Sequence, residues 1–212
     1  IDDSTALRPT YVTVSAWVKP NNTTQTTKGI VDKRYSEADD PYTSYSIGIN
    51  SSGLYEFSVS TGDEGSYTAA VATSALTTNW THILGTYDGT DIKIYINGNL
   101  EDTTGFTDTI GYSSLSLRIG QYSTGQFFNG AIDEVKVYNQ ALTAEQVKVD
   151  MNRGASQVLG TLSSASNTQP NSASNEYCPP DSSASICDGP VGEWKFDEKT
   201  GSNSNDSSGN NY

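Results

Sequence analysis

Basic residues, histidine, methionine and long apolar runs are all scarce in this chain. Its 212 residues include 12 Lys and Arg against 25 Asp and Glu, one His, one Met and two Cys, which gives a formal net charge of −13. Binding to nucleic acid requires clustered Lys and Arg side chains that displace counterions. The twelve Lys and Arg residues here are spread from Arg8 to Lys199 and nowhere form a cluster larger than the pair Lys33-Arg34, so that class of partner is excluded. No apolar run approaches the roughly 20 residues that span a bilayer, so membrane insertion is not expected.

Side chains that enzymes use for chemistry are equally scarce. His82 is the single histidine, so no two-histidine metal motif can form. The sequence contains neither a Gly-x-Ser-x-Gly elbow nor a phosphate-binding Gly-Lys-Ser/Thr loop. We therefore expect His82 to be a structural residue, and we predict that the chain is not an enzyme.

Turn formers and strand formers dominate what is present, with 19 Gly and 13 Tyr. Between residues 11 and 18, apolar side chains alternate with others at the period of two typical of a sheet strand. Similar short runs cover residues 45–49, 55–59, 80–87, 92–96, 115–119 and 132–138, with turn residues between them. One helix is expected between an N-cap at Thr143 and a stop at Gly154. The pattern predicts an acidic, extracellular all-β domain.

The composition changes sharply after Gly154. Residues 155–190 contain nine Ser, three charged side chains and one aromatic. That is too little apolar surface to offset the entropy of ordering, which predicts a linker. A disulfide between Cys178 and Cys187 is predicted, because both cysteines lie in the segment least able to order itself. Two reduced, unrelated thiols are the alternative, and they would suit a cytosolic chain better.

Three separate motifs resemble laminin-G-like jelly-roll domains. Residues 79–98, which begin Asn-Trp-Thr-His-Ile-Leu and end Ile-Tyr-Ile-Asn-Gly, resemble the central hairpin of that family. Residues 128–143 are similar to its closing strand and short helix, and residues 14–20 to an early core strand. Together they span about residues 10 to 154 in the family's order. The resemblance implies a concanavalin A-like, two-sheet antiparallel jelly-roll sandwich with one short helix.

One further motif departs from the family's order. Family members open with a strand reading Gly-x-Trp-x-Phe-Asp-Glu, whereas here the matching segment at 192–198 comes last. The chain, which starts at Ile1, therefore resembles one repeat cut out of phase, as a processed product or an excised segment. We predict an incomplete sandwich over 1–154, a Ser/Asn-rich linker over 155–190, and the displaced opening strand and loop over 191–212.

A sandwich that lacks its opening strand presents a sheet edge that can accept another strand. The displaced strand could fold back onto its own chain, insert into a neighbouring copy to give a head-to-tail polymer, or begin a following domain. Trp194 and Phe196 alternate with Lys195 and should both point into a core. The expected partners are therefore copies of the chain or adjacent repeats.

Asp133 is the most informative carboxylate of the predicted strands. If its strand alternates regularly, Asp133 shares a face with Val135 and Val137, where an unpaired charge is costly. Related domains often hold a structural calcium ion between an Asp-x-Ser-Gly loop and the closing-strand Asp, which correspond here to Asp206 and Asp133. Carboxylate ligands suit Ca²⁺. The alternative is that Asp133 accepts hydrogen bonds from backbone amides at a bulge or strand start, with no metal.

The resemblance also raises carbohydrate chemistry. Related glucanases carry Glu-x-Asp-x-x-Glu along one strand, and the nearest match has Ala131 and Lys136 at the two glutamate positions, so hydrolysis is not expected. Sugar recognition relies on aromatic platforms and polar loop side chains. The best such cluster consists of Tyr35, Tyr42, Tyr45, Asp39 and Asp40, with Tyr112 and Tyr122 as further loop aromatics.

Two functions follow from these patterns. The main prediction is a non-catalytic extracellular structural or adhesive unit of a cell-surface protein or filament, assembled by strand complementation. The alternative is a carbohydrate-binding module whose partners are glycans. An assembly unit should form chains in solution and lose them when residues 190–212 are deleted.

Overall fold

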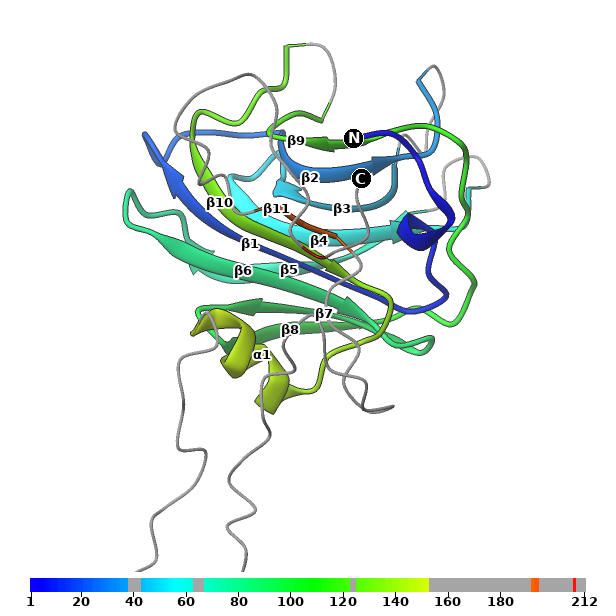
Figure 1. Ribbon diagram of the computed structural model, residues 1–212. Helices are drawn as coiled ribbons and strands as arrows, with labels where there is room; N and C mark the ends of the chain where they lie inside the picture. Colours follow the sequence, from blue (N-terminus) through cyan, green and yellow to red (C-terminus); the bar gives the residue numbers. More distant parts are fainter. Residues whose placement is uncertain (38–42, 63–66, 123–124, 153–191, 195–207, 209–212) are drawn as a thin grey trace, which may run out of the picture.

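Two antiparallel sheets face each other across a common core (Figure 1). The computed structural model describes residues 1–37, 43–62, 67–122, 125–152, 192–194 and 208. In this part of the chain the predicted all-β sandwich with one short α-helix is confirmed, and a 3-10 turn over Thr5–Leu7 is added. No helix among these residues is long and apolar enough to cross a membrane.

The described residues form one sheet of six strands and one of five. The six-stranded sheet has the order β11-β10-β1-β6-β7-β8, and the five-stranded sheet the order β5-β4-β3-β2-β9. The strands of the first sheet are β1 (Val12–Pro20), β6 (Thr81–Tyr87), β7 (Asp91–Ile96), β8 (Asn99–Gly105), β10 (Gly130–Tyr138) and β11 (Gly192–Trp194). Those of the second are β2 (Lys28–Arg34), β3 (Thr43–Ile49), β4 (Leu54–Ser60), β5 (Tyr67–Ala75) and β9 (Leu117–Ile119).

Strand β1 lies inside the six-stranded sheet, between β10 and β6. Its apolar positions, Val12, Val14, Ala16 and Val18, are fully buried in the core between the sheets. The alternation read from the sequence therefore gives the correct inward face. Burial of four such side chains contributes several kcal/mol to folding, at about 25 cal/mol per Å² of apolar surface.

Between the two sheets, an aromatic ring of one strand packs directly against a glycine of another. A Cβ atom added to Gly85 of β6 would lie 2.1 Å from the ring of Phe57 in β4. Only a residue without a side chain allows the ring to fill this space. At one edge of the sandwich, carboxylates of β8 close the gap between the sheets: Glu101 accepts hydrogen bonds from the backbone of Thr73 and Ser74, and Asp102 from Val71.

Helix α1 (Ala144–Met151) packs on the outer face of the six-stranded sheet, where Leu84, Tyr95, Tyr138, Leu142 and Val147 form a second apolar cluster. It begins at Thr143 with a capping box, in which Thr143 and Gln146 satisfy each other's backbone amides. The predicted N-cap is thus confirmed. The helix ends at Met151, and Gly154 lies outside the described residues.

Strand β11 adds to the six-stranded sheet beside β10 of the same chain, as Figure 1 shows. Trp194 points into the main core and is 1% exposed, as predicted from its alternation. Phe196, Asp206, Cys178 and Cys187 lie outside the described residues. The division into three parts and the disulfide therefore stay predictions.

Candidate functional site

A cavity of about 400 Å³ lies on the outer face of the five-stranded sheet. The described residues that line it come from β2 to β5, from the residue before β2, from the turn between β3 and β4, and from the loop after β9. They are Thr27, Lys28, Thr43, Ser46, Gly48, Ile49, Asn50, Ser51, Glu56, Ser58, Tyr67 and Tyr122. We call this cavity the sheet pocket.

The floor of the sheet pocket is made of hydroxyl groups because β3 and β4 alternate. Tyr45 and Ile47 of β3 point into the core, so Ser46 between them points outward. Ser46 pairs in register with Ser58 of β4, and their hydroxyl oxygens are 2.9 Å apart. Gly48 keeps the floor open near Lys28, since an added Cβ would lie 2.7 Å from the Lys28 carbonyl oxygen.

One wall of the pocket holds a fixed carboxylate. The Asn50 side-chain oxygen accepts hydrogen bonds from the backbone nitrogens of Ser52 at 2.9 Å and Leu54 at 3.0 Å. Asn50 also hydrogen-bonds the Glu56 carboxylate. Burial raises the pKa of Glu56, and the Asn50 hydrogen bond opposes this rise. The turn between β3 and β4 therefore positions an acceptor before any ligand arrives.

Two tyrosines contribute the aromatic surface. Tyr67, at the start of β5, is 57% exposed. Tyr122 belongs to the loop after β9, and its ring centroid lies 5.7 Å from the guanidinium carbon of Arg34. Arg34 also donates a hydrogen bond of 3.1 Å to the Tyr122 carbonyl oxygen. The position of Tyr122 thus depends on a buried arginine.

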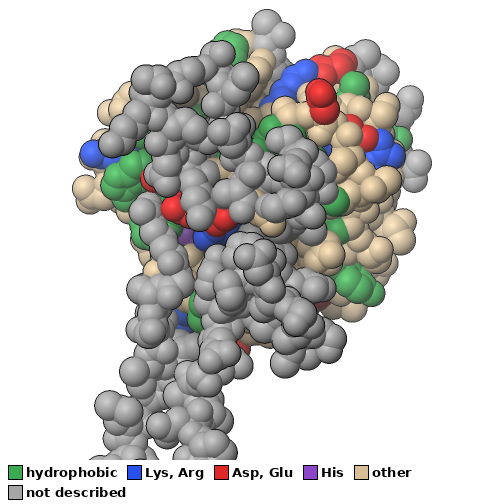
Figure 2. Space-filling view, viewed as in Figure 1, with side chains coloured by type: hydrophobic (Ala, Val, Ile, Leu, Met, Phe, Trp, Pro, Cys, Tyr) green, Lys and Arg blue, Asp and Glu red, His purple; other side chains and the backbone are tan. Residues whose placement is uncertain are grey.

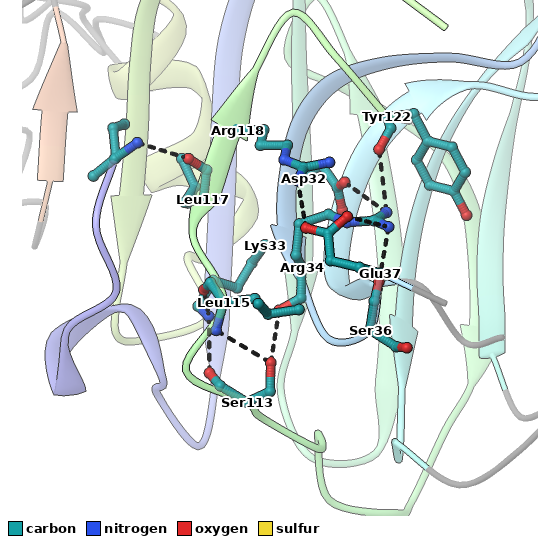
Figure 3. Close-up of polar contacts among 11 residues, drawn as sticks. Asp32, Lys33, Arg34, Ser36, Glu37, Ser113, Leu115, Leu117, Arg118 and Tyr122 are labelled. Atoms are coloured by element: carbon teal, nitrogen blue, oxygen red, sulfur yellow. Dashed lines mark hydrogen bonds and ion pairs between the residues drawn. The ribbon is translucent and has the colours of Figure 1, made fainter. Parts of the chain in front are cut away.

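Arg34 is the centre of a charged network beside the sheet pocket (Figure 3). Its guanidinium group lies 3.3 Å from Asp32 and 3.6 Å from Glu37, and it donates a 2.7 Å hydrogen bond to the Ser36 carbonyl oxygen. Arg118 of β9 pairs with Glu37 as well. The network ties the segment after β2 to the loop that carries Tyr122.

Asp32 is the most perturbed member of this network. Burial raises its pKa from 3.8 to about 7, although the nearby charge of Arg34 acts in the opposite direction. Among the described residues its Oδ1 atom has no hydrogen-bond partner. Asp32 therefore binds a proton far more readily than an exposed aspartate does.

The structure separates the tyrosines that the sequence groups together. Tyr45 is fully buried, and its hydroxyl group donates a 3.1 Å hydrogen bond to the Leu7 carbonyl oxygen. It is therefore not available as an exposed platform, because it occupies an inward position of β3. Tyr35 is half-buried, and its ring lies where a side chain on Gly62 would otherwise be. Tyr42, Asp39 and Asp40 lie outside the described residues.

Sequence reasoning singled out Tyr122 but missed Tyr67, Glu56 and the hydroxyl floor. A usable signal was present in β3, where Ser44-Tyr45-Ser46-Ile47-Gly48-Ile49 alternates small polar or glycine positions with large buried ones. Such a strand has one apolar face and one polar face. The polar face of β3 is the floor of the sheet pocket.

Asp133 lies at a bulge, which overturns the expected face. Asp133 pairs with Trp17 and Lys136 with Ser15, so Glu134 and Val135 together oppose Ala16. Glu134 adopts the positive φ of 49° at this point. The extra residue places Asp133 on the opposite face from the buried Val135, and Asp133 accepts a 2.9 Å hydrogen bond from the Glu134 backbone nitrogen.

The predicted calcium ion at Asp133 would need further oxygen ligands. Within the described ranges, no three His, Cys, Asp or Glu side chains are grouped so that they could hold a metal ion. The proposed second ligand, Asp206, lies outside these ranges. A calcium ion between Asp133 and Asp206 thus stays a prediction.

His82 belongs to a buried polar cluster beneath α1, apart from the sheet pocket. Its Nε2 atom lies 3.0 Å from Asp150, which also bonds Lys136 at 3.1 Å and the Tyr138 hydroxyl at 2.7 Å. Burial alone would raise the pKa of Asp150, but the His82 hydrogen bond and the Lys136 charge hold it well below its usual range. The cluster anchors α1 to the sheet, which fits the structural role expected for His82.

Comparison with known proteins agrees with this fold. Among solved structures, a candidate carbohydrate-binding protein from Bacteroides ovatus has a TM-score of 0.63 at 20% identity, over 95% of this chain and 50% of its own. Domain 4 of AbnA, an extracellular GH43 arabinanase from Geobacillus stearothermophilus solved with arabinotriose, has a TM-score of 0.52 at 24% identity, over 68% and 67%. The binding domain of botulinum neurotoxin DC, in complex with rat synaptotagmin II, has a TM-score of 0.53 at 18% identity, over 70% and 37%.

These identities establish a shared fold, and this chain spans half the length of the Bacteroides ovatus protein. No curated protein sequence gives a significant match. The family model described as the concanavalin A-like lectin/glucanases superfamily, of the laminin-G type, matches residues 1–148, well over half of the chain. The protein therefore belongs to the laminin-G-like family of the concanavalin A-like lectin/glucanases superfamily.

Proposed function

We propose that the chain is a non-catalytic, extracellular carbohydrate-binding module and that the sheet pocket is its binding site. The observation that carries this proposal is the chemistry of the pocket. Hydroxyl groups form its floor, Glu56 and Asn50 form a wall, and Tyr67 and Tyr122 supply aromatic rings. Sugars present hydroxyl groups at their edges and apolar C–H faces, so they need polar groups and rings together.

The solved relatives support the same reading. One is described as carbohydrate-binding, and another was solved in complex with arabinotriose. The alternative prediction from the sequence is therefore favoured over the main prediction of a structural filament unit. Assembly with other copies remains a prediction, and the pairing of β11 with β10 in one chain offers a direct way to test it.

A glycan array probed with the full chain, followed by calorimetry on the best hit, tests the proposed function. Tyr67→Ala and Tyr122→Ala should each weaken binding by about tenfold, because each removes a stacking surface worth roughly 1 kcal/mol or more. Tyr11→Ala is the matched control, since Tyr11 is 47% exposed and lies outside the pocket lining. The proposal fails if no glycan binds, or if both pocket variants bind as tightly as the unmodified chain.

A further inference from the structure

The charges in the sheet pocket are few and balanced. Among its described lining residues only Lys28 and Glu56 are charged, one of each sign. They lie on β2 and β4 with β3 between them, so their backbones are roughly 10 Å apart at a strand spacing of about 4.8 Å. The lining as described therefore presents one cation, one anion and a polar floor.

The two arginines nearby already form ion pairs or hydrogen bonds with other groups of the protein. Arg34 is held by Asp32, Glu37 and two backbone carbonyl oxygens, and Arg118 pairs with Glu37 (Figure 3). A ligand carboxylate or sulfate would have to separate these pairs or rely on Lys28 alone, close to the negative charge of Glu56. Bringing like charges together in a partly buried site is costly.

The electrostatic field of the whole protein also disfavours an anionic ligand. A net charge of −13 repels polyanions before they reach the pocket. Among the described side chains coloured in Figure 2, basic and acidic groups lie next to one another. A polyanionic glycan therefore meets a protein of like net charge and finds no guanidinium group among the pocket residues described.

An uncharged sugar fits the same groups well. The Glu56 carboxylate is a pure acceptor that can take hydrogen bonds from two hydroxyl groups at once. The Asn50 side chain beside it is itself held by the backbone nitrogens of Ser52 and Leu54, which limits the ordering needed on binding. Lys28 can donate to ring or hydroxyl oxygens, and the serine hydroxyls can either donate or accept.

We infer that the sheet pocket selects an uncharged sugar unit, with Glu56 as its principal hydrogen-bond acceptor, and that it discriminates against uronic, sialylated and sulfated glycans. This inference rests on the proposed function and narrows it to a ligand class. It assigns to Glu56 and Lys28 a role in specificity that the fold alone does not imply.

The test uses the full chain on an array that holds neutral arabino-, galacto- and gluco-oligosaccharides beside oligogalacturonates, sialylated and sulfated glycans. Binding should be confined to neutral glycans. For the best hit, calorimetry at 50 mM and 500 mM NaCl should give dissociation constants within about twofold, because salt screens charge pairs and leaves neutral contacts almost unchanged. Binding confined to acidic glycans, or a steep loss of affinity with salt, would overturn the inference while leaving the proposed function in place. If no glycan binds, both fail.

Substitutions of Glu56 and of Lys28 test the two charged groups of the pocket separately. Glu56→Gln should weaken binding of the neutral hit at least tenfold, whereas Glu145→Gln, the same change at an exposed position of α1, should leave it unchanged. Lys28→Ala should weaken binding less than about tenfold, because the Lys28 ammonium group forms a hydrogen bond with an uncharged ligand and no ion pair. A Lys28→Ala loss above tenfold together with an unchanged Glu56→Gln affinity would show an anionic ligand and refute the inference. Thermal melts of each variant check that the fold is intact.

Discussion

Trp194 of β11 lies opposite Val135 of β10, and its indole ring is buried in the core shared by both sheets. Strand β10 ends at Tyr138, fifty-six residues before Trp194. The segment that resembles the family's opening strand thus occupies the edge of the sheet beside β10. Glu193 lies next to Lys136 in the same ladder. Burial lowers the pKa of Lys136, but Asp150 and, to a smaller extent, the charges of Glu134 and Glu193 raise it above its ordinary value.

Removing the indole should reveal how much of the core depends on β11. Trp194→Ala should lower the free energy of unfolding by about 3–5 kcal/mol, because it leaves a large cavity that the surroundings cannot fill. Trp80→Ala is the control, since Trp80 is 42% exposed, and should cost about 1 kcal/mol or less. Guanidinium chloride titrations followed by fluorescence give both values. Equal, small effects would mean that β11 does not complete the core.

The connection between β10 and β11 favours pairing within one chain over strand exchange between copies. The 39 residues between Asn152 and Gly192 keep both segments of one chain within a small volume, at an effective concentration on the order of millimolar. At micromolar concentration we therefore expect a monomer by light scattering. A chain that ends at residue 189 should be less stable, and a peptide of residues 190–212 should restore it. Long assemblies of the full chain that disappear in the shortened one would instead restore the filament function.

Alternation predicted the buried face of the strands wherever they are regular. Val12 to Val18 of β1 follow the rule, and the capping box at Thr143 marks the start of α1 as expected. Strand β2 is harder to recognise, because Asp32, Lys33 and Arg34 read as a polar loop. Their charges are satisfied by distant partners: Lys33, for example, pairs with Asp3 at 3.0 Å and donates to the Leu115 carbonyl oxygen at 2.6 Å. Local sequence carries no information about such partners.

The candidate site was harder to predict than the fold for a related reason. Tyr35 and Tyr45 look equivalent in the sequence, yet Tyr45 occupies one of the alternate positions of β3 that point into the core. One extra residue at Glu134 reverses the face of Asp133 in the same way. Both errors come from the register of strand pairing, which depends on residues far apart in the chain.

Protonation of Asp32 should make stability fall as the pH rises. Its pKa is about 7 in the folded chain and near 3.8 when unfolded, so between pH 4 and pH 7 the folded state holds a proton that the unfolded state releases. Asp32→Asn should flatten this slope and leave the variant more stable than the unmodified chain at pH 8, by up to a few kcal/mol. Arg34, Arg118 and Glu37 face Asp32 and remain in both proteins.

Denaturant midpoints measured from pH 4.5 to pH 8 for both proteins isolate the contribution of Asp32, because other groups cancel in the difference. Asp2→Asn makes the same chemical change at an exposed position and serves as the control. If the difference between Asp32→Asn and the unmodified chain does not vary with pH, the buried carboxyl group does not titrate in this range.

Asp150 should show the opposite dependence on pH. Its folded pKa lies below the unfolded value near 3.8, so its stabilising effect is fully present above pH 4 and is lost as the pH falls further. At pH 7, Asp150→Asn should cost about 3–5 kcal/mol, because it leaves Lys136 buried without its carboxylate partner. Glu145→Gln on the exposed side of the same helix should change stability by less than about 0.5 kcal/mol. Unfolding of both variants at pH 7 and pH 3 measures this, and a cost for Asp150→Asn that is the same at both pH values would contradict it.

The loop that carries Tyr122 packs closely against the backbone of β2 at Gly29. A Cβ atom at Gly29 would lie 2.4 Å from the Tyr122 backbone nitrogen, so a side chain there must push the loop away from the strand. Gly29→Ala should therefore displace the Tyr122 ring and weaken glycan binding by about tenfold, while lowering stability by only 1–3 kcal/mol. Gly105→Ala is the control, because its Cβ would meet nothing within 4 Å. Calorimetry against the array hit measures affinity, and thermal melts measure stability. If Gly29→Ala binds normally, the loop after β9 does not form part of the binding site, because Tyr122 would have moved without effect.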